Sequence, residues 1–180
     1  MLRANAVGSA SRGVDRRKVP TTSPVSDRVR RKSRKAESAL AELKGEPRIM
    51  VFGCDNANDV TELQADNIVV LSLFCTGMIP PTLVEYAQRH GADGVFITGC
   101  RTGDCYYRLG NAWMDQRFEG RRKPVLRQRA KRGRITVYRA AETDTGKLRR
   151  RLAEFQRDIA ALKQEESASK ASQEREVNDA

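Results

Sequence analysis

The chain has 180 residues, a net charge of +11 and a pI near 10.0, which leaves room for one domain of ordinary size. No apolar run approaches the roughly 18 residues of a membrane span, and the basic N-terminus lacks the apolar segment of a secretory signal. We therefore expect a cytoplasmic protein without a membrane span, in which disulfide bonding of the cysteines is not the default.

The positive charge is concentrated in two runs, at residues 28–35 and 117–134. Neither run has the interleaved aromatic residues of a single-strand nucleic-acid binder. The charge is therefore interpreted as a solvated face or as a docking surface for an acidic protein, and we expect no nucleic-acid partner.

In chain order, the first segment is rich in Arg, Lys, Ser and Pro and has hardly any large apolar side chains. Such a composition cannot bury enough surface to offset the entropy of ordering, so residues 1–46 are predicted to be a disordered basic tail. Residues 34–43 (RKAESALAEL) are compatible with a helix near its end. By the same reasoning, residues 164–180 are predicted to be a disordered polar tail, which leaves residues 47–163 as a single domain.

Within this domain, short apolar runs alternate with amphipathic stretches. Strands are predicted at residues 48–53, 67–74, 94–99 and 134–140. Helices are predicted at residues 80–90, from about 106 to 118, and from about 144 to 162. Strands that alternate with helices predict an α/β fold, here a three-layer domain with a mainly parallel four-stranded sheet.

Three of the four cysteines follow predicted strands directly. Cys54, Cys75 and Cys100 come after the first, second and third strands. In a parallel sheet these strand ends meet at one edge, with neighbouring strands about 4.8 Å apart. Cys105 can join them through the short loop GCRTGDC, so the sequence predicts a site of four thiols.

Four thiolates suit either a structural zinc ion or an iron–sulfur cluster. His90 is the only histidine, which excludes Cys2His2 zinc sites and Rieske centres within one chain. Structural zinc usually takes paired C-x-x-C ligands, which this chain lacks, so the dispersed thiols favour a cluster. A nucleophilic cysteine with His90 as its base, or a persulfide carrier using Cys100 and Cys105, would leave the other thiols unexplained. Thiols that serve only as small buried apolar groups would not explain why all four fall at one edge.

A longer pattern surrounds these cysteines. The stretch LFCTGMIPPTLVEYAQRHGADGVFITGCRTGDCYYRLGN, at residues 73–111, combines four motifs. They are a cysteine followed by small residues, a proline-led helix, a GADGV strand and a GC-x-x-GDC-x-Y-x-x-GN loop. In these motifs, and from about Ile49 to Phe155 overall, the chain resembles the methyl-viologen-reducing hydrogenase delta subunit family, the bacterial hydrogenase iron–sulfur subunit type included.

The resemblance implies a small α/β domain that carries one [2Fe–2S] cluster. Carried over to this sequence, the cluster ligands would be Cys54, Cys75, Cys100 and Cys105. Such a domain would pass electrons between a hydrogenase or formate dehydrogenase and a flavin- or iron–sulfur-containing, heterodisulfide-reductase-like subunit. It would be an oxidoreductase component rather than an independent catalyst. The competing interpretation is a zinc-stabilised α/β binding module with a basic tail that contacts nucleic acid.

One departure from the family concerns the first cysteine. Many relatives have C-x-x-C there, whereas this chain has CDNA, with Ala57 in place of the second thiol. Because four cysteines remain, we interpret the missing thiol as one that is not a ligand. In the second loop, Arg101 is a candidate for tuning the cluster potential through its charge, or a surface arginine. Asp104 is a candidate for orienting the loop, or an exposed turn residue.

Overall fold

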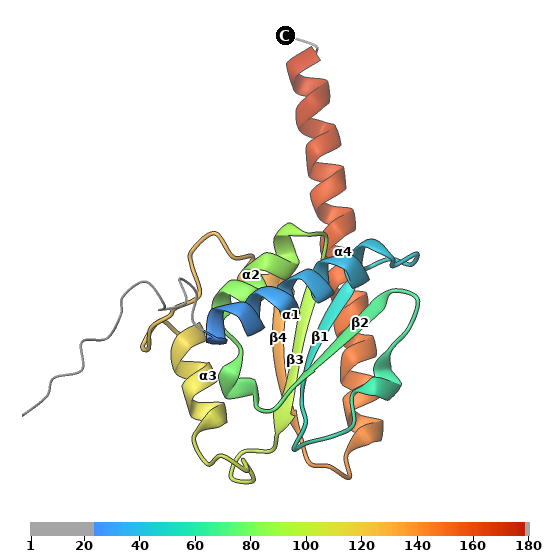
Figure 1. Cartoon of the computed structure of the whole chain (residues 1–180). Helices are drawn as coiled ribbons and strands as arrows, with labels where there is room; N and C mark the ends of the chain where they lie inside the picture. Colours follow the sequence, from blue (N-terminus) through green and yellow to red (C-terminus); the bar gives the residue numbers. More distant parts are fainter. Residues whose placement is uncertain (1–23, 179–180) are drawn as a thin grey trace, which may run out of the picture.

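The computed structural model describes residues 24–178, which form a sheet flanked by helices (Figure 1). The four strands are β1 (Ile49–Cys54), β2 (Ile68–Leu73), β3 (Gly94–Cys100) and β4 (Ile135–Ala140). All three strand pairs are parallel, and the spatial order is β2-β1-β3-β4. The predicted four-stranded parallel sheet is confirmed, and each strand lies within about a residue of its predicted bounds.

Helices cover both faces of the sheet. They are α1 (Pro24–Ala41), α2 (Pro81–Arg89), α3 (Gly110–Phe118) and α4 (Thr145–Asn178), with short 3-10 turns η2 (Thr61–Leu63), η3 (Thr76–Met78) and η4 (Arg132–Arg134). On one face, α1, α2 and α3 pack over Met50 and Phe52 of β1. On the other, α4 packs over Ile49 and Val51. This alternation along β1 explains why the central strands have to be apolar on both faces, and it confirms the three-layer α/β class.

The N-terminal segment is more ordered than its composition predicts. The sequence predicts a disordered tail over residues 1–46 with a helical stretch only near 34–43, whereas the structure has the longer helix α1, in which Ala36 and Leu40 are buried against α2 and β2. Ala39 and Leu43 pack beside them. The stripe escapes a search for large apolar residues because half of it is alanine, whose side chain buries little surface but loses no rotamer entropy in a helix. Residues 1–23 of the predicted tail lie outside the described part.

The last helix is also longer than predicted. The apolar stripe of Leu148, Leu152, Phe155 and Ile159 is buried as the spacing predicts. However, α4 continues beyond residue 162 to Asn178 and extends past the sheet (Figure 1), where the sequence predicts a disordered tail over 164–180. Strong helix formers such as Ala, Glu, Lys and Gln make up most of this extension, which explains a helix without an apolar face. Residues 179–180 lie outside the described part.

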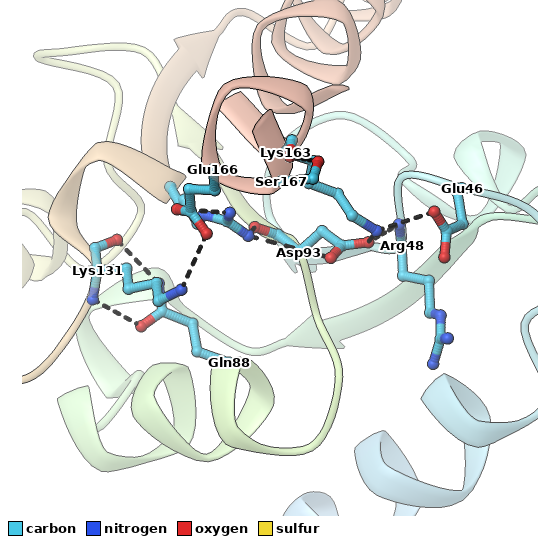
Figure 2. A network of polar contacts seen from close by, with 9 residues as sticks. Glu46, Arg48, Gln88, Asp93, Lys131, Lys163, Glu166 and Ser167 are labelled. Carbon is cyan, nitrogen blue, oxygen red and sulfur yellow. Dashed lines mark hydrogen bonds and ion pairs between the residues drawn. The ribbon is translucent and has the colours of Figure 1, made fainter. Parts of the chain in front are cut away.

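A network of charged residues closes the amino edge of the sheet, where the strands begin (Figure 2). We call it the amino-edge network; its charged members are Glu46, Asp93, Lys131, Arg134, Lys163 and Glu166. Lys163 of α4 bridges Glu46 and Asp93, at 2.9 and 3.0 Å. Arg134, which precedes β4, donates to Glu166 at 2.8 Å. The network therefore ties α4 to the starts of β3 and β4.

No helix in the described part of the chain is long and apolar enough to cross a membrane.

Candidate metal centre

The cysteines lie at the carboxyl edge of the sheet, opposite the amino-edge network. Cys54 and Cys100 are the last residues of β1 and β3, and Cys75 follows β2 by two residues. β1 pairs with both β2 and β3, so the chain direction across the sheet reverses between β1 and β3. Open α/β sheets bind their ligands at such a switch point, outside the carboxyl ends of the strands.

The first pair of thiols sits at this switch point. The Sγ atoms of Cys54 and Cys100 are 3.9 Å apart, and both side chains are buried. Cys54 Sγ also donates to the Phe74 carbonyl at 3.7 Å, and Cys100 Sγ donates to the Asn56 carbonyl at 3.3 Å. Two thiolates on one tetrahedral ion, with metal–sulfur bonds of about 2.3 Å, would be about 3.8 Å apart. The spacing of this pair therefore fits two ligands of one metal.

The second pair meets at Gly110, the first residue of α3. A Cβ atom at position 110 would lie 2.2 Å from Cys75 Sγ and 3.1 Å from Cys105 Sγ, so both sulfurs occupy the space that a side chain would need. The helix can approach this closely because Gly77 of η3 also lacks a side chain, and a Cβ there would lie 2.6 Å from Gly110 Cα. The Gly77 amide donates to Cys75 Sγ at 3.3 Å. Because Gly77 and Gly110 lack side chains, the backbone of η3 and the N-terminus of α3 can lie directly against the sulfur of Cys75.

The loop that carries Cys105 delays the start of α3. We predicted a helix from about residue 106, but α3 begins at Gly110. Between them the chain turns, with the Arg108 amide donating to the Cys105 carbonyl at 2.7 Å and Arg108 at a φ of 59°. Asn111 then donates to the Cys100 carbonyl at 2.9 Å, which fixes α3 to the end of β3. As a result, the positive end of the α3 dipole faces the sulfurs of the second pair, where it favours negative charge.

The four sulfurs act on one another electrostatically. Burial raises the pKa of the Cys75 thiol, although the amide of Gly77 opposes this shift. Burial also raises the pKa of the Cys100 thiol, and the nearby sulfur of Cys54 raises it further. Cys105 acts in the same direction on both groups. The Cys75 and Cys100 thiols are therefore harder to ionise than exposed thiols, and a nearby positive charge would oppose this shift.

The structure thus brings all four predicted site cysteines to one edge, as two pairs. In residues 24–178, no three His, Cys, Asp or Glu side chains are gathered closely enough to hold a single metal ion. Ala57 lies in the turn after β1, where its amide donates to the Cys54 carbonyl at 3.0 Å.

The other candidates divide between the two edges. Arg101 pairs with Asp104 at 2.9 Å, with both side chains more than half exposed, so its charge is locally compensated. His90 follows α2 at the amino edge, where its Nδ1 lies 2.8 Å from the Tyr86 carbonyl and its ring stacks on Tyr86. Since the cysteines lie at the opposite edge, His90 is not in place to act as a base for any of them.

Sequence reasoning missed a cavity beside the second pair. It has a volume of about 390 Å³ and is lined mainly by apolar groups. The lining includes Cys75, Met78, Tyr107, Trp113 and Arg117. Arg117 reaches in from the last turn of α3 and donates to the Gly77 carbonyl. Nothing in the sequence distinguishes this arginine from the others of the run 117–134, so only the fold could identify it.

Fold and site together describe a small α/β domain with two pairs of thiols at the carboxyl edge of its parallel sheet. A family model described as the methyl-viologen-reducing hydrogenase, delta subunit, matches residues 47–163. The chain belongs to this family.

Curated relatives share part of this domain. The vhc iron–sulfur subunit of the F420-non-reducing hydrogenase of Methanococcus voltae is 38% identical over 74 residues, which cover 37% of this chain and 51% of the relative. The iron–sulfur subunit of the F420-non-reducing hydrogenase of Archaeoglobus profundus is 32% identical over 82 residues, which cover 41% of this chain and 60% of the relative. The chain therefore spans only about half to three fifths of these relatives. Both are archaeal, whereas the resemblance led us to expect the bacterial type.

A third relative is a much larger protein. One subunit of the ferredoxin:CoB-CoM heterodisulfide reductase of Methanosarcina mazei is 44% identical over 45 residues, which cover 25% of this chain but only 6% of the relative. A segment like this one therefore also occurs inside a long reductase chain.

Proposed function

We propose that this chain is a cytoplasmic electron-transfer subunit that carries a [2Fe–2S] cluster within a hydrogenase- or heterodisulfide-reductase-like oxidoreductase complex. The cluster ligands would be Cys54, Cys75, Cys100 and Cys105. The observation that carries the proposal is the meeting of all four thiols, in two pairs, at the carboxyl edge of the sheet.

Pairing of the thiols favours a two-iron cluster over one zinc ion. Each iron of a [2Fe–2S] cluster takes two protein ligands, and the pairs Cys54–Cys100 and Cys75–Cys105 supply two such sets. A structural zinc ion needs all four sulfurs within about 2.3 Å of one point. The two separate pairs match the ligand sets of two irons more closely than the single tetrahedron that one zinc ion requires.

The surroundings of the thiols suit a negatively charged centre. The Gly77 amide and the N-terminus of α3 place partial positive charge at the second pair. Burial of Cys54, Cys75 and Cys100 keeps water from these sulfurs, while Cys105 is partly exposed. When bound, the cluster would supply the one-electron chemistry. The chain's own residues would hold it and set its environment.

Electrons have to leave through a surface that a partner can cover. Most of the large apolar side chains that the structure leaves exposed belong to the segments around the cysteines. They are Phe74, Met78, Tyr106, Tyr107, Leu109 and Trp113. Arg101, Arg108 and Arg122 lie in or beside the same segments. Apolar residues beside positive charge suit an acidic partner protein. The relatives named as hydrogenase and heterodisulfide reductase subunits support flavin- or iron–sulfur-containing oxidoreductase subunits as partners.

Metal analysis of the full chain tests the proposal. Protein purified without oxygen should contain about two irons and two sulfides per chain, with visible absorption that bleaches on reduction with dithionite. One electron per chain should complete the reduction. A colourless chain with stoichiometric zinc would instead identify a zinc-stabilised module and overturn the proposal.

Variants at the first cysteine sharpen the test. Cys54→Ser should lose most of the iron while its circular dichroism spectrum is retained. The matched variant Ala57→Cys restores the C-x-x-C spacing of many relatives and should leave iron content unchanged, since four ligands are already present. If Cys54→Ser alone keeps its full iron content, the assignment of Cys54 as a ligand is wrong, whereas rescue by Ala57→Cys would show that a thiol at position 57 can replace it.

A further inference from the structure

The cavity beside Cys75 places one charged group in an otherwise apolar lining. Its walls include Met78, Tyr107 and Trp113, and Cys75 itself contributes to the lining. Inside such a lining, the effective dielectric constant is lower than in water, and a charge acts over a longer distance. The charged group is Arg117.

Two contacts fix Arg117 in this position. Its Nη1 donates to the carbonyl of Gly77, the residue whose amide donates to Cys75 Sγ at 3.3 Å. The Leu126 amide donates to the Arg117 carbonyl at 3.1 Å, which holds the end of α3. Gly77 therefore links the two groups: its carbonyl accepts from the Arg117 guanidinium, and its amide donates to the sulfur of Cys75.

The charge of Arg117 is not cancelled locally. Among the side chains that the structure describes, no carboxylate forms an ion pair with Arg117, and its Nε is buried without a hydrogen-bond partner. Burial lowers the pKa of Arg117, and nearby Arg122 lowers it further, but a guanidinium stays protonated at neutral pH. Other partly buried arginines are paired: Arg134 with Glu166, and Arg139 with Asp115.

We propose that Arg117 is a positioning residue of the cysteine site, which raises the reduction potential of the bound cluster by keeping an uncompensated positive charge in the cavity at Cys75. The inference rests on the proposed function. Reduction adds one electron to the site, so a fixed cation beside it stabilises the reduced form more than the oxidised form. Arg101, which the sequence suggested for this role, is exposed and paired with Asp104.

Potentiometric titration of the iron-loaded full chain tests the inference. Arg117→Gln removes the charge and should lower the midpoint potential, so that the ratio of reduced to oxidised protein at a fixed potential falls about tenfold, equivalent to about 59 mV for one electron. Arg117→Lys keeps the charge and should stay near the wild-type midpoint. A matched control, Arg157→Gln, which is exposed on α4, should also leave the midpoint unchanged.

Iron content, measured first, separates the inference from the proposed function. A wild-type chain that binds zinc or no metal overturns both. A wild-type chain that binds two irons, with Arg117→Gln loaded equally and unchanged in midpoint, overturns the inference alone. If Arg117→Gln fails to hold iron, Arg117→Lys shows whether the charge of Arg117 or its contact with Gly77 is required. If Arg117→Lys keeps its iron and a midpoint near the wild type, the proposed role of the charge is supported. If both variants lose iron while the chain stays folded, the inference is overturned and Arg117 only stabilises the turn at Gly77.

Discussion

The two edges of the sheet differ in how their charged and ionisable side chains are compensated. At the amino edge, Asp93 and Glu166 are matched by Arg134 and Lys163, and every charge of the network has a partner within 4.0 Å. At the carboxyl edge, four thiols crowd together beside Arg117, which has no carboxylate partner among the described residues. The charges of the amino-edge network are therefore paired within the protein, whereas the positive charge of Arg117 at the carboxyl edge is not.

This difference separates what stabilises the fold from what the site needs. A closed ion network at the strand starts holds α4 to the sheet without any ligand. The crowded thiols and the unpaired arginine have no such compensation among the described residues, and a bound iron–sulfur cluster, which would hold the sulfurs as thiolates and carry a negative charge overall, would supply it for both. Changes at the amino edge should therefore alter stability alone, and changes at the carboxyl edge should alter metal binding first.

The largest effect is expected from Gly110→Ala. The added Cβ would lie 2.2 Å from Cys75 Sγ, so the second pair of thiols must move apart or α3 must shift. Overpacking of this kind costs about 1–3 kcal/mol, and each 1.4 kcal/mol at the site weakens binding about tenfold. We expect the variant to lose most of its iron, measured per chain after anaerobic purification.

Gly146→Ala is the matched control for this change. Gly146 lies in the first turn of α4, and a Cβ there would meet nothing within 4 Å. The substitution should leave iron content unchanged and stabilise the helix by up to about 1 kcal/mol. If Gly110→Ala keeps its full iron content, the close approach of α3 to the thiols is not required for binding.

At the amino edge, Asp93→Asn should lower stability without loss of iron. The Asp93 carboxylate, 16% exposed, pairs with Lys163 at 3.0 Å and accepts from the Arg48 amide at 2.8 Å. Neutralising it leaves Lys163 and Arg134 without their shared partner, which should cost about 1–3 kcal/mol in the free energy of unfolding by urea.

The exposed Asp158 on α4 gives a control with the same chemical change. Asp158→Asn should stay within about 0.5 kcal/mol of the wild type. Loss of iron from Asp93→Asn at unchanged stability would show that the two edges are not independent.

The parts of this comparison that the sequence could predict are those set by local pattern. Short apolar runs in the sequence predicted the four strands. In a parallel sheet, Cys54, Cys75 and Cys100 at the ends of three of these strands then have to share one edge. The stripe from Leu148 to Ile159 predicted the packed half of α4 for the same reason.

The parts that escaped prediction depend on contacts between distant segments. The placement of Arg117 at Gly77 requires α3 to lie against η3, and no local pattern encodes that approach. The amino-edge network joins residues up to 117 positions apart, as in the pair of Lys163 and Glu46. The helical stretch at residues 34–43 was noted, but the full length of α1 and its packing were missed because alanine contributes little to an apolar pattern even where it packs closely, as Ala36 does.

A smaller effect is expected from Glu166→Gln, and it should depend on pH. A hydrogen bond from Arg134 holds the pKa of Glu166 below its usual range. A lowered pKa in the folded state stabilises the protein above the unfolded carboxyl pKa of about 4.3, and this contribution is lost as the pH falls through the folded value. The urea midpoints of wild type and Glu166→Gln should differ at neutral pH and converge in acid. Midpoints that differ equally at both pH values would show that packing, rather than charge, anchors Glu166.

The smallest effect is expected from removing the end of α4. Residues 168–173 are exposed, and none of them forms a hydrogen bond or ion pair with the rest of the domain. A chain that ends after Ser167 should therefore unfold within about 0.5 kcal/mol of the full chain and bind the same iron. A chain that ends after Leu162 also loses Lys163 and Glu166, and its urea midpoint should fall while iron per folded chain stays unchanged. Equal midpoints for the two truncations would mean that the amino-edge network does not stabilise the fold, and the contrast between the edges would then rest on the thiols alone.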